Sequence, residues 1–284
     1  MQSEPGSVEF PVVVDADTLR TLPDALLVDV RWYLDGRDGR AAYEQAHLPG
    51  AVWVDLEHQL ASDDAPATAG RHPFPDPDAF AREMGRLGIG DDTVVVAYDD
   101  TGGLTAGRLV VMLRMLGRRA AMLDGGIAAW LAAGGDVEGG RVEPVPAAFT
   151  SRPWPADRLA DADETAALAA GDGVVLDARA RERFTGEVTQ IDPRPGHVPG
   201  AVNAPWSAVL GADGRLRPVD ELRAHFAALG VDGERPAVAY CGSGVSACAN
   251  LIAMEHAGVG PARLFVASWS GWSADPERPA ELGA

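Results

Sequence analysis

The sequence contains no lysine, so arginine supplies all 24 of its permanently charged basic side chains. A pocket that binds an anion through side chains must therefore use guanidinium groups, which hold a planar carboxylate through two parallel hydrogen bonds. The formal net charge of the 284 residues is −18, and a surface of that sign repels phosphate backbones. We expect no nucleic-acid partner.

Cysteine is also scarce. Cys241 and Cys248 are the two cysteines, and a bridge between positions this close would constrain little of the fold, which fits a reducing compartment. The six histidines show no ligand spacing, so we expect neither a metal nor an organic cofactor. No apolar run approaches the roughly 20 residues of a membrane span, and the first residues lack a signal-peptide pattern. These absences predict a cytoplasmic protein without a membrane partner.

The chain repeats one pattern in its two halves. Three pairs of segments correspond in the same order, namely 26–31 with 174–179, 47–52 with 197–202, and 94–98 with 237–240. The second pair reads His, an apolar residue and then Pro-Gly-Ala-Val in both halves. The separation of Tyr98 from Trp130 also equals that of Tyr240 from Trp272. Landmarks that match in sequence and spacing indicate an internal duplication.

Each half reads as alternating strands and helices. The strands are short continuous apolar runs, which is typical of parallel strands covered by helices on both faces. We therefore predict an α/β fold of two domains, each a mostly parallel sheet flanked by helices. A Pro-rich stretch over 141–160 is expected to link a domain over 1–140 to a domain over 161–284. Helices are expected over 78–87, 104–116 and 246–257.

Cys241 carries the clearest chemical signal. It follows an apolar strand and opens the turn Cys-Gly-Ser-Gly-Val-Ser before a helix. Gly242 and Gly244 permit the positive φ that lets such a turn curl its N–H groups inward. Those groups and the helix N-terminus favour negative charge, so we expect a thiolate that acts as a nucleophile. Cys248 lies within the helix and is expected to be a packing residue.

The first half carries Asp99 where the second half carries Cys241. A carboxylate does not attack sulfur, and its charge repels an incoming anion. We therefore expect the first domain to be non-catalytic and to support or cover the second. Asp99 can also be a turn or N-cap residue, which is compatible with that interpretation. His47 and His197 occupy equivalent turns in both halves, and this symmetry predicts a structural role for them.

These features resemble the tandem-domain rhodaneses over nearly the whole chain. The resemblance rests on the duplicated halves, the His-x-Pro-Gly-Ala turns, the Asp99/Cys241 asymmetry and the loop after the cysteine. In that family, thiosulfate sulfurtransferases typically carry a basic pair after the cysteine, whereas mercaptopyruvate sulfurtransferases carry Cys-Gly-Ser/Thr-Gly-Val-Thr. The present loop follows the second pattern, with Gly242, Ser243, Gly244 and Val245 in place and Ser246 instead of threonine.

The resemblance implies a sulfurtransferase that takes sulfur from a small anionic donor. Sulfur from 3-mercaptopyruvate would form a persulfide on Cys241, and a thiol, thioredoxin or cyanide would accept it. Thiosulfate is the alternative donor. A cysteine phosphatase would need Arg six positions after the cysteine, where Ala247 stands. A non-catalytic binding module would leave Cys241 an ordinary thiol.

The resemblance also implies the other site residues. Arg183 and Arg194, which precede the second His-x-Pro-Gly turn, are expected to bind the donor carboxylate. Asp55, His72 and Ser243 are expected to form a constellation that stabilises and protonates the leaving group. The remaining loop residues expected at the substrate are Gly242, Gly244, Val245 and Ser246. From the residues alone, Ser243 can instead cap the helix, and Arg183 can be a surface charge. Arg179 is expected to pair with Asp177.

Overall fold

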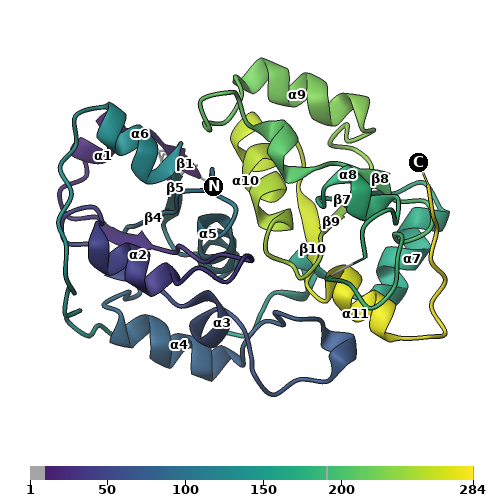
Figure 1. The fold of residues 1–284 in the computed structure, drawn as a ribbon, viewed down its shortest axis with the longest axis horizontal. Coiled ribbons are helices and arrows are strands. Elements are labelled where there is room, and N and C mark those ends of the chain that lie inside the picture. The colour runs from purple at the N-terminus through teal and green to yellow at the C-terminus, as the bar shows by residue number, and fades with distance from the viewer. Residues whose placement is uncertain (1–9, 190, 284) are drawn as a thin grey trace, which may run out of the picture.

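The computed structural model describes residues 10–189 and 191–283, which form two α/β lobes side by side (Figure 1). In the first lobe the sheet order is β1-β5-β4-β2-β3, with β1 Val13–Val14, β2 Leu26–Asp29, β3 Val52–Trp53, β4 Val95–Tyr98 and β5 Ala120–Leu123. In the second lobe the order is β6-β10-β9-β7-β8, with β6 Leu159–Ala160, β7 Val174–Asp177, β8 Val202–Asn203, β9 Ala237–Tyr240 and β10 Ala262–Phe265.

Both sheets are parallel throughout and share one strand order. The predicted α/β fold with two parallel sheets is therefore confirmed. All four residues of β4 and of β9 are buried, as expected for central strands covered on both faces. The carboxyl ends of β4 and β9 lead into the loops that carry Asp99 and Cys241.

Helices cover both faces of each sheet. The first lobe has α1 Ala16–Arg20, α2 Gly39–Gln45, α3 Leu56–Gln59, α4 Pro77–Arg86, α5 Ala106–Met115 and α6 Gly126–Ala132. The second has α7 Ala162–Ala170, α8 Arg181–Phe184, α9 Val219–Ala228, α10 Ala247–Ala257 and α11 Ser268–Ala274. The predicted helices appear as α4, α5 and α10, and each begins within two residues of its predicted start. No helix in the described ranges is long and apolar enough to cross a bilayer.

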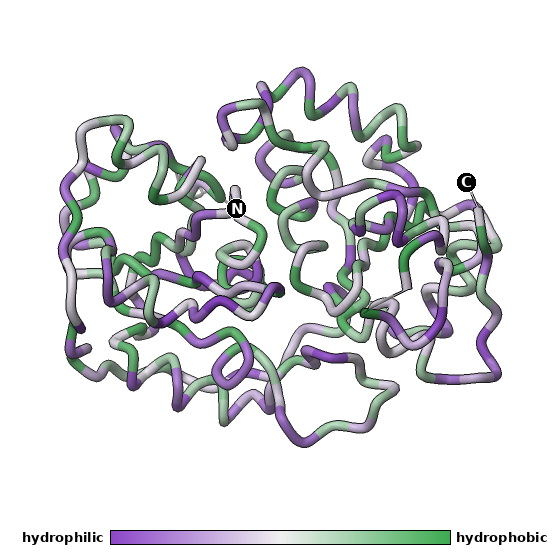
Figure 2. Tube along the Cα trace, viewed as in Figure 1, coloured by the Kyte–Doolittle hydropathy of each residue, from purple (hydrophilic) through white to green (hydrophobic). Residues whose placement is uncertain are grey.

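The helices α5 and α10 face each other where the lobes meet (Figure 1). Gly107 lies at their closest approach, since a Cβ built there would lie 3.3 Å from Ile252 Cδ1 and 3.4 Å from the Ala249 nitrogen. Both helices contribute to one apolar core that continues across the interface. Along α4 and α9 the colour in Figure 2 alternates between hydrophobic and hydrophilic, as expected for helices with one face in solvent.

The two His-x-Pro-Gly turns are built alike. The Nδ1 of His47 lies 2.9 Å from the Tyr43 carbonyl, and the Nδ1 of His197 lies 2.8 Å from the Phe184 carbonyl. Each imidazole stacks on the aromatic ring of that same residue. Both histidines are buried, at 0% and 3% exposure. The structural role predicted for them from their symmetry is therefore confirmed.

The segment over 141–160 packs against the first lobe before its last two residues, Leu159 and Ala160, form β6 of the second sheet. Phe149 lies edge-on to Phe80 of α4, and Trp154 is tilted against the same ring. The Trp154 indole N–H also donates to the Pro75 carbonyl at 2.8 Å. These contacts fasten the connecting segment to α4 and to the loop that precedes it, which carries His72.

Candidate active site

A cavity of about 350 Å³ lies between the two lobes, and Cys241 lines it. The first lobe contributes Trp32, Arg71 and His72, and the second contributes Arg183 beside the cysteine loop. The cavity therefore combines a nucleophile from one copy of the fold with polar side chains from the other. This arrangement brings together residues that lie far apart in the sequence.

Cys241 stands at the carboxyl end of β9 and is 1% exposed. Its N–H donates to Ser268 Oγ at 3.1 Å, and its carbonyl accepts from Trp269 N–H at 2.9 Å. The Ser243 N–H lies 3.5 Å from the Cys241 sulfur. Among the residues that the structure describes, this is the main-chain donor within hydrogen-bonding distance of that sulfur. The sequence predicted that several main-chain N–H groups would face the Cys241 thiol, and the structure shows one of them.

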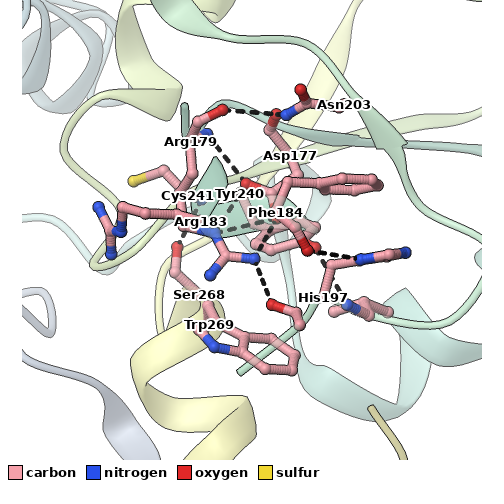
Figure 3. A network of polar contacts seen from close by, with 12 residues as sticks. Asp177, Arg179, Arg183, Phe184, His197, Asn203, Tyr240, Cys241, Ser268 and Trp269 are labelled. Carbon is pink, nitrogen blue, oxygen red and sulfur yellow. Dashed lines mark hydrogen bonds and ion pairs between the residues drawn. The ribbon is translucent and has the colours of Figure 1, made fainter. Parts of the chain in front are cut away.

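A buried ion pair fixes the strand ends beside Cys241 (Figure 3). Arg179 contacts Asp177 at 2.6 Å, and both side chains are 1% exposed or less. The Arg179 guanidinium also lies over the Trp269 ring, 5.0 Å from its centre. Burial by itself lowers the pKa of Arg179, but the charge and hydrogen bonds of Asp177, with Tyr240 and Asp192 nearby, together outweigh burial and raise that pKa. The predicted pair of Arg179 with Asp177 is confirmed.

The first lobe reaches the cysteine loop through His72. Its Nδ1 lies 2.8 Å from Ser243 Oγ, so the structure brings together two of the predicted catalytic residues. Trp32 lies edge-on against the imidazole, with 5.5 Å between ring centres. Burial, together with the positive charges of Arg108 and Arg71, lowers the pKa of His72 to about 4. At neutral pH the imidazole is therefore uncharged and able to exchange a proton with the Ser243 hydroxyl.

The low pKa of His72 predicts a specific pH dependence of stability. Between pH 6.5 and about 4 the unfolded chain binds a proton at this histidine that the folded protein excludes. Folding stability is therefore lost as the pH falls through that window. We expect wild type to lose about 2–3 kcal/mol more than His72→Asn between pH 7 and pH 4, measured by urea unfolding. Parallel stability curves for the two proteins would contradict the assignment.

Asp55 does not join His72 and Ser243. Its carboxylate caps α3 by accepting the N–H groups of Glu57 at 2.9 Å and His58 at 3.3 Å, and it is not among the residues that line the cavity. An Asp at the N-cap, the residue just before a helix, satisfies N–H groups that have no partner within the helix. The structure thus gives Asp55 a capping role and does not bring it to the other two predicted catalytic residues.

Two arginines lie directly over Gly242, next to Cys241. A Cβ built on Gly242 would lie 2.8 Å from an Nη2 of Arg183 and 2.9 Å from an Nη2 of Arg71. A side chain at this position would therefore displace the guanidinium groups, so the close approach requires glycine. Arg183 stands where the sequence predicted a donor-binding residue. Arg71 was not predicted, because it lies in a Pro-rich loop whose position depends on how the lobes pack.

Arg194 faces away from the cavity. Its guanidinium donates at 3.0 Å to three main-chain carbonyls, those of Ser273, Asp275 and Arg278. These bonds fasten the chain ahead of the second His-x-Pro-Gly turn to the segment after α11. Arg194 is not among the residues that line the cavity, so the structure does not bring this predicted donor-binding residue to the site. Arg71 provides the second guanidinium instead.

Arg108 of α5 is a further polar residue near the site, and the sequence did not indicate it. It is fully buried and donates to the carbonyls of Gly244 at 2.9 Å, His72 at 2.7 Å and Leu60 at 3.1 Å. Burial lowers its pKa to about 10, so the side chain stays charged at neutral pH. Arg108 therefore ties the cysteine loop of the second lobe to the His72 loop of the first.

The first lobe shows what this kind of loop can hold. The Asp99 carboxylate accepts four main-chain N–H groups at 2.8–2.9 Å, those of Thr101, Gly103, Thr105 and Ala106. The Thr105 hydroxyl adds a fifth bond at 3.0 Å. Asp99 occupies the position of Cys241 in the duplicated fold. The turn thus surrounds the carboxylate oxygens of Asp99, which lie two bonds beyond its Cβ. The N–H donors belong to residues two to seven positions after Asp99 in the chain.

Cys248 is separated from this chemistry. It is 0% exposed, and its thiol donates to the Gly244 carbonyl at 3.3 Å. Burial raises the pKa of Cys248 to about 12, so the group remains a neutral thiol. The predicted packing role of Cys248 is confirmed. Within the described ranges, no group of three or more His, Cys, Asp or Glu side chains is arranged to hold a metal ion.

Comparisons with known proteins agree with this architecture. The family model for the rhodanese-like domain matches residues 15–133 and again 161–275. A probable 3-mercaptopyruvate sulfurtransferase of Pseudomonas aeruginosa is 44% identical over 268 residues, covering 92% of this chain and 93% of that protein. A putative thiosulfate sulfurtransferase, SseB of Mycobacterium tuberculosis, is 42% identical over 261 residues, or 90% of each chain.

The fold comparison gives the same result. The crystal structure of SseA, a 3-mercaptopyruvate enzyme of Escherichia coli, superposes with a TM-score of 0.81 at 31% identity. That match covers 91% of this chain and 99% of the other. With two matched domains and relatives this similar over nearly their whole length, the chain belongs to the rhodanese family of sulfurtransferases.

Proposed function

We propose that the protein transfers a sulfane sulfur from 3-mercaptopyruvate, through a persulfide on Cys241, to a thiophilic acceptor. The observation that carries this proposal is the pair of guanidinium groups, from Arg71 and Arg183, that lie over Gly242. A carboxylate held by these groups would place a small 2-oxo acid within reach of the neighbouring sulfur. Relatives of this chain include enzymes named for this donor.

The reaction begins with attack of the Cys241 thiolate on the thiol sulfur of the donor. A sulfur–sulfur bond forms while the donor carbon–sulfur bond breaks, and its electron pair leaves with pyruvate as the enolate. The enolate then takes up a proton. The Ser243 hydroxyl and the neutral His72 imidazole, 2.8 Å apart, form a short relay for that proton. This is covalent catalysis in two displacement steps.

The Asp99 loop supports the idea that the cysteine loop holds the intermediate. A cysteine persulfide ends two bonds beyond Cβ in a negatively charged sulfur, as an aspartate ends in a charged oxygen. In the first lobe that end is surrounded by main-chain donors. Equivalent N–H groups after Cys241 would stabilise the outer sulfur until a thiol, thioredoxin or cyanide removes it.

The first lobe is proposed to be non-catalytic in itself but necessary for the site. Its own loop carries Asp99 in place of a nucleophile, and it supplies Arg71, His72 and Arg108 to the other lobe. The proposed domains remain 1–140 and 161–284, joined by the segment 141–160, whose last two residues form β6 of the second sheet.

Thiosulfate is the second candidate donor. The similarity to a protein named as a putative thiosulfate sulfurtransferase favours it. The loop residues Gly242 and Ser243 add no positive charge after the cysteine, which disfavours a dianion relative to a monoanion. Comparing kcat/KM for the two donors with one acceptor distinguishes these functions, and we expect the larger value for 3-mercaptopyruvate.

Arg183→Ala tests how the donor is held. We expect KM for 3-mercaptopyruvate to rise about 10- to 100-fold, the equivalent of one charge-assisted contact, with kcat changed much less. Arg181→Ala is the matched control, because Arg181 lies on the same short helix with its side chain exposed. Steady-state kinetics of both variants provide the measurement. An unchanged KM for Arg183→Ala would remove this residue from the donor site.

A further inference from the structure

A buried carboxylate already lies among the arginines of the cavity. The Asp192 side chain is 3% exposed and accepts from Arg183 through Nη2, at 2.7 and 2.8 Å, and through Nε at 3.2 Å. Arg71 and Arg179 each add a contact at 3.3 Å. Three guanidinium groups thus converge on one carboxylate. The contacts reach it from both lobes, since Arg71 comes from the first.

The same three arginines line the cavity that contains Cys241. Arg71 and Arg183 use part of their hydrogen-bonding capacity on Asp192 and direct an Nη2 toward Gly242. A guanidinium carries five N–H donors, so both retain donors for a bound anion. An anion held by them would lie a few ångströms from the Asp192 carboxylate.

The segment that carries Asp192 is tied on both sides. The preceding Ile191 carbonyl accepts from Arg71 Nη1 at 2.9 Å. Two residues further on, Arg194 is bonded to three carbonyls, and its own carbonyl accepts from the Trp269 indole at 3.0 Å. These contacts keep the carboxylate at the arginine cluster rather than letting the loop withdraw it when the donor enters.

The charges of this cluster can be counted. Arg71, Arg179 and Arg183 contribute three positive charges, and Asp177 and Asp192 contribute two negative charges. The neutral His72 adds nothing at pH 7. These five side chains therefore carry a net charge of +1, without the charge of the Cys241 thiolate, and the other four would carry +2 without Asp192.

We propose that Asp192 is a specificity-determining residue, which lowers the net charge of the anion site and so selects a monoanionic donor over a dianionic one. This inference rests on the proposed function for the identity of the two donors. At neutral pH 3-mercaptopyruvate carries one negative charge on its carboxylate, whereas thiosulfate carries two. The repulsion by a fixed carboxylate is proportional to the charge of the anion, so it is twice as large for thiosulfate.

Asp192→Asn tests this inference, because it removes the charge while keeping the size of the side chain. Suppose that the change raises kcat/KM for 3-mercaptopyruvate about 3-fold. The free-energy effect on thiosulfate is twice as large, so its kcat/KM should rise by the square of that factor, about 10-fold. We therefore expect the ratio of the two kcat/KM values to shift by about 3-fold or more toward thiosulfate. Asp192→Ser removes the same charge and serves if the Asn variant does not fold, as judged by thermal unfolding.

Two control variants separate charge from packing. Asp192→Glu keeps the charge and is expected to leave the donor ratio unchanged, whatever it does to the absolute rate. Asp91→Asn removes a carboxylate that pairs with the buried Arg118 at 2.6 Å in the first lobe and does not line the cavity. This control is also expected to preserve the ratio.

Binding of non-reacting anions supplies a readout that does not depend on turnover. Calorimetric titration of wild type and Asp192→Asn with pyruvate and with sulfate, at constant ionic strength, should show a larger gain in affinity for sulfate. Equal gains or equal losses for both anions would overturn the proposed selectivity. Absence of sulfur transfer from either donor, with the sulfate effect present, would instead refute the proposed function and leave the charge effect standing.

Discussion

Cys241→Ser is expected to abolish sulfur transfer and leave the fold intact. A serine hydroxyl remains protonated at neutral pH and is a poor nucleophile toward sulfur, so no persulfide forms. We expect kcat to fall by about 1,000-fold or more. The side chain is 1% exposed and differs from serine mainly in the size of one atom, so thermal unfolding should change little.

Cys248→Ser is the matched control for that experiment. Cys248 is the other cysteine of the chain, lies on α10 and is fully buried with its pKa raised to about 12. Its replacement is expected to cost some stability and to retain most of the activity. Comparable loss of turnover in both variants, or full activity in Cys241→Ser, would show that the nucleophile is assigned wrongly.

Arg108→Gln is expected to have the second largest effect, on both stability and turnover. Three buried carbonyls lose their charged donor, those of Gly244, His72 and Leu60, and an unpaired buried polar group costs about 1–3 kcal/mol. We expect the free energy of unfolding to fall by about 3 kcal/mol or more. The cysteine loop and the His72 loop also lose their shared anchor, so we expect kcat to fall about 10-fold or more.

Arg118→Gln separates these two consequences. Arg118 is also buried in the first lobe, donates to the Thr150 carbonyl at 3.1 Å and pairs with Asp91. We expect this control to lose stability while its kcat stays near that of wild type. Urea unfolding and steady-state kinetics of both variants provide the comparison. If kcat fell equally in both, the effect of Arg108 would be one of general stability and not of loop positioning.

The architecture was predictable because its signals are local and occur twice. The paired segments 26–31 and 174–179 predicted equivalent strands, and both lobes do contain them in one sheet order. His47 and His197 predicted a shared structural role because a residue that recurs in both copies cannot be specific to one. The cysteine turn also depends on adjacent residues, namely a strand, two glycines and a helix.

Of the site residues that the resemblance implied, the structure brings some together at the cavity and places others elsewhere. His72 and Ser243 do meet, although they are 171 positions apart. Asp55 instead satisfies the first N–H groups of α3. Arg194 instead satisfies carbonyls after α11. Asp55 bonds main-chain groups two and three residues away, whereas Arg194 bonds main-chain groups 79 to 84 residues away. Sequence alone does not tell whether a polar side chain will bond the main chain or point into a cavity.

The residues that sequence reasoning missed depend on how the lobes pack. Arg71 and Arg108 belong to the first lobe and act on the loop of the second, so no local pattern marks them. Asp192 stands in an irregular segment among several charged residues, and its importance follows only from the three guanidinium groups around it.

The mass of the protein after exposure to its donor tests the central claim most directly. One equivalent of 3-mercaptopyruvate, without an acceptor, should add one sulfur atom, about 32 Da, and peptide mapping should place it on Cys241. Cyanide should then remove that mass and release one equivalent of thiocyanate. A protein that turns over without this adduct, or that carries the added sulfur on Cys248, would contradict the account.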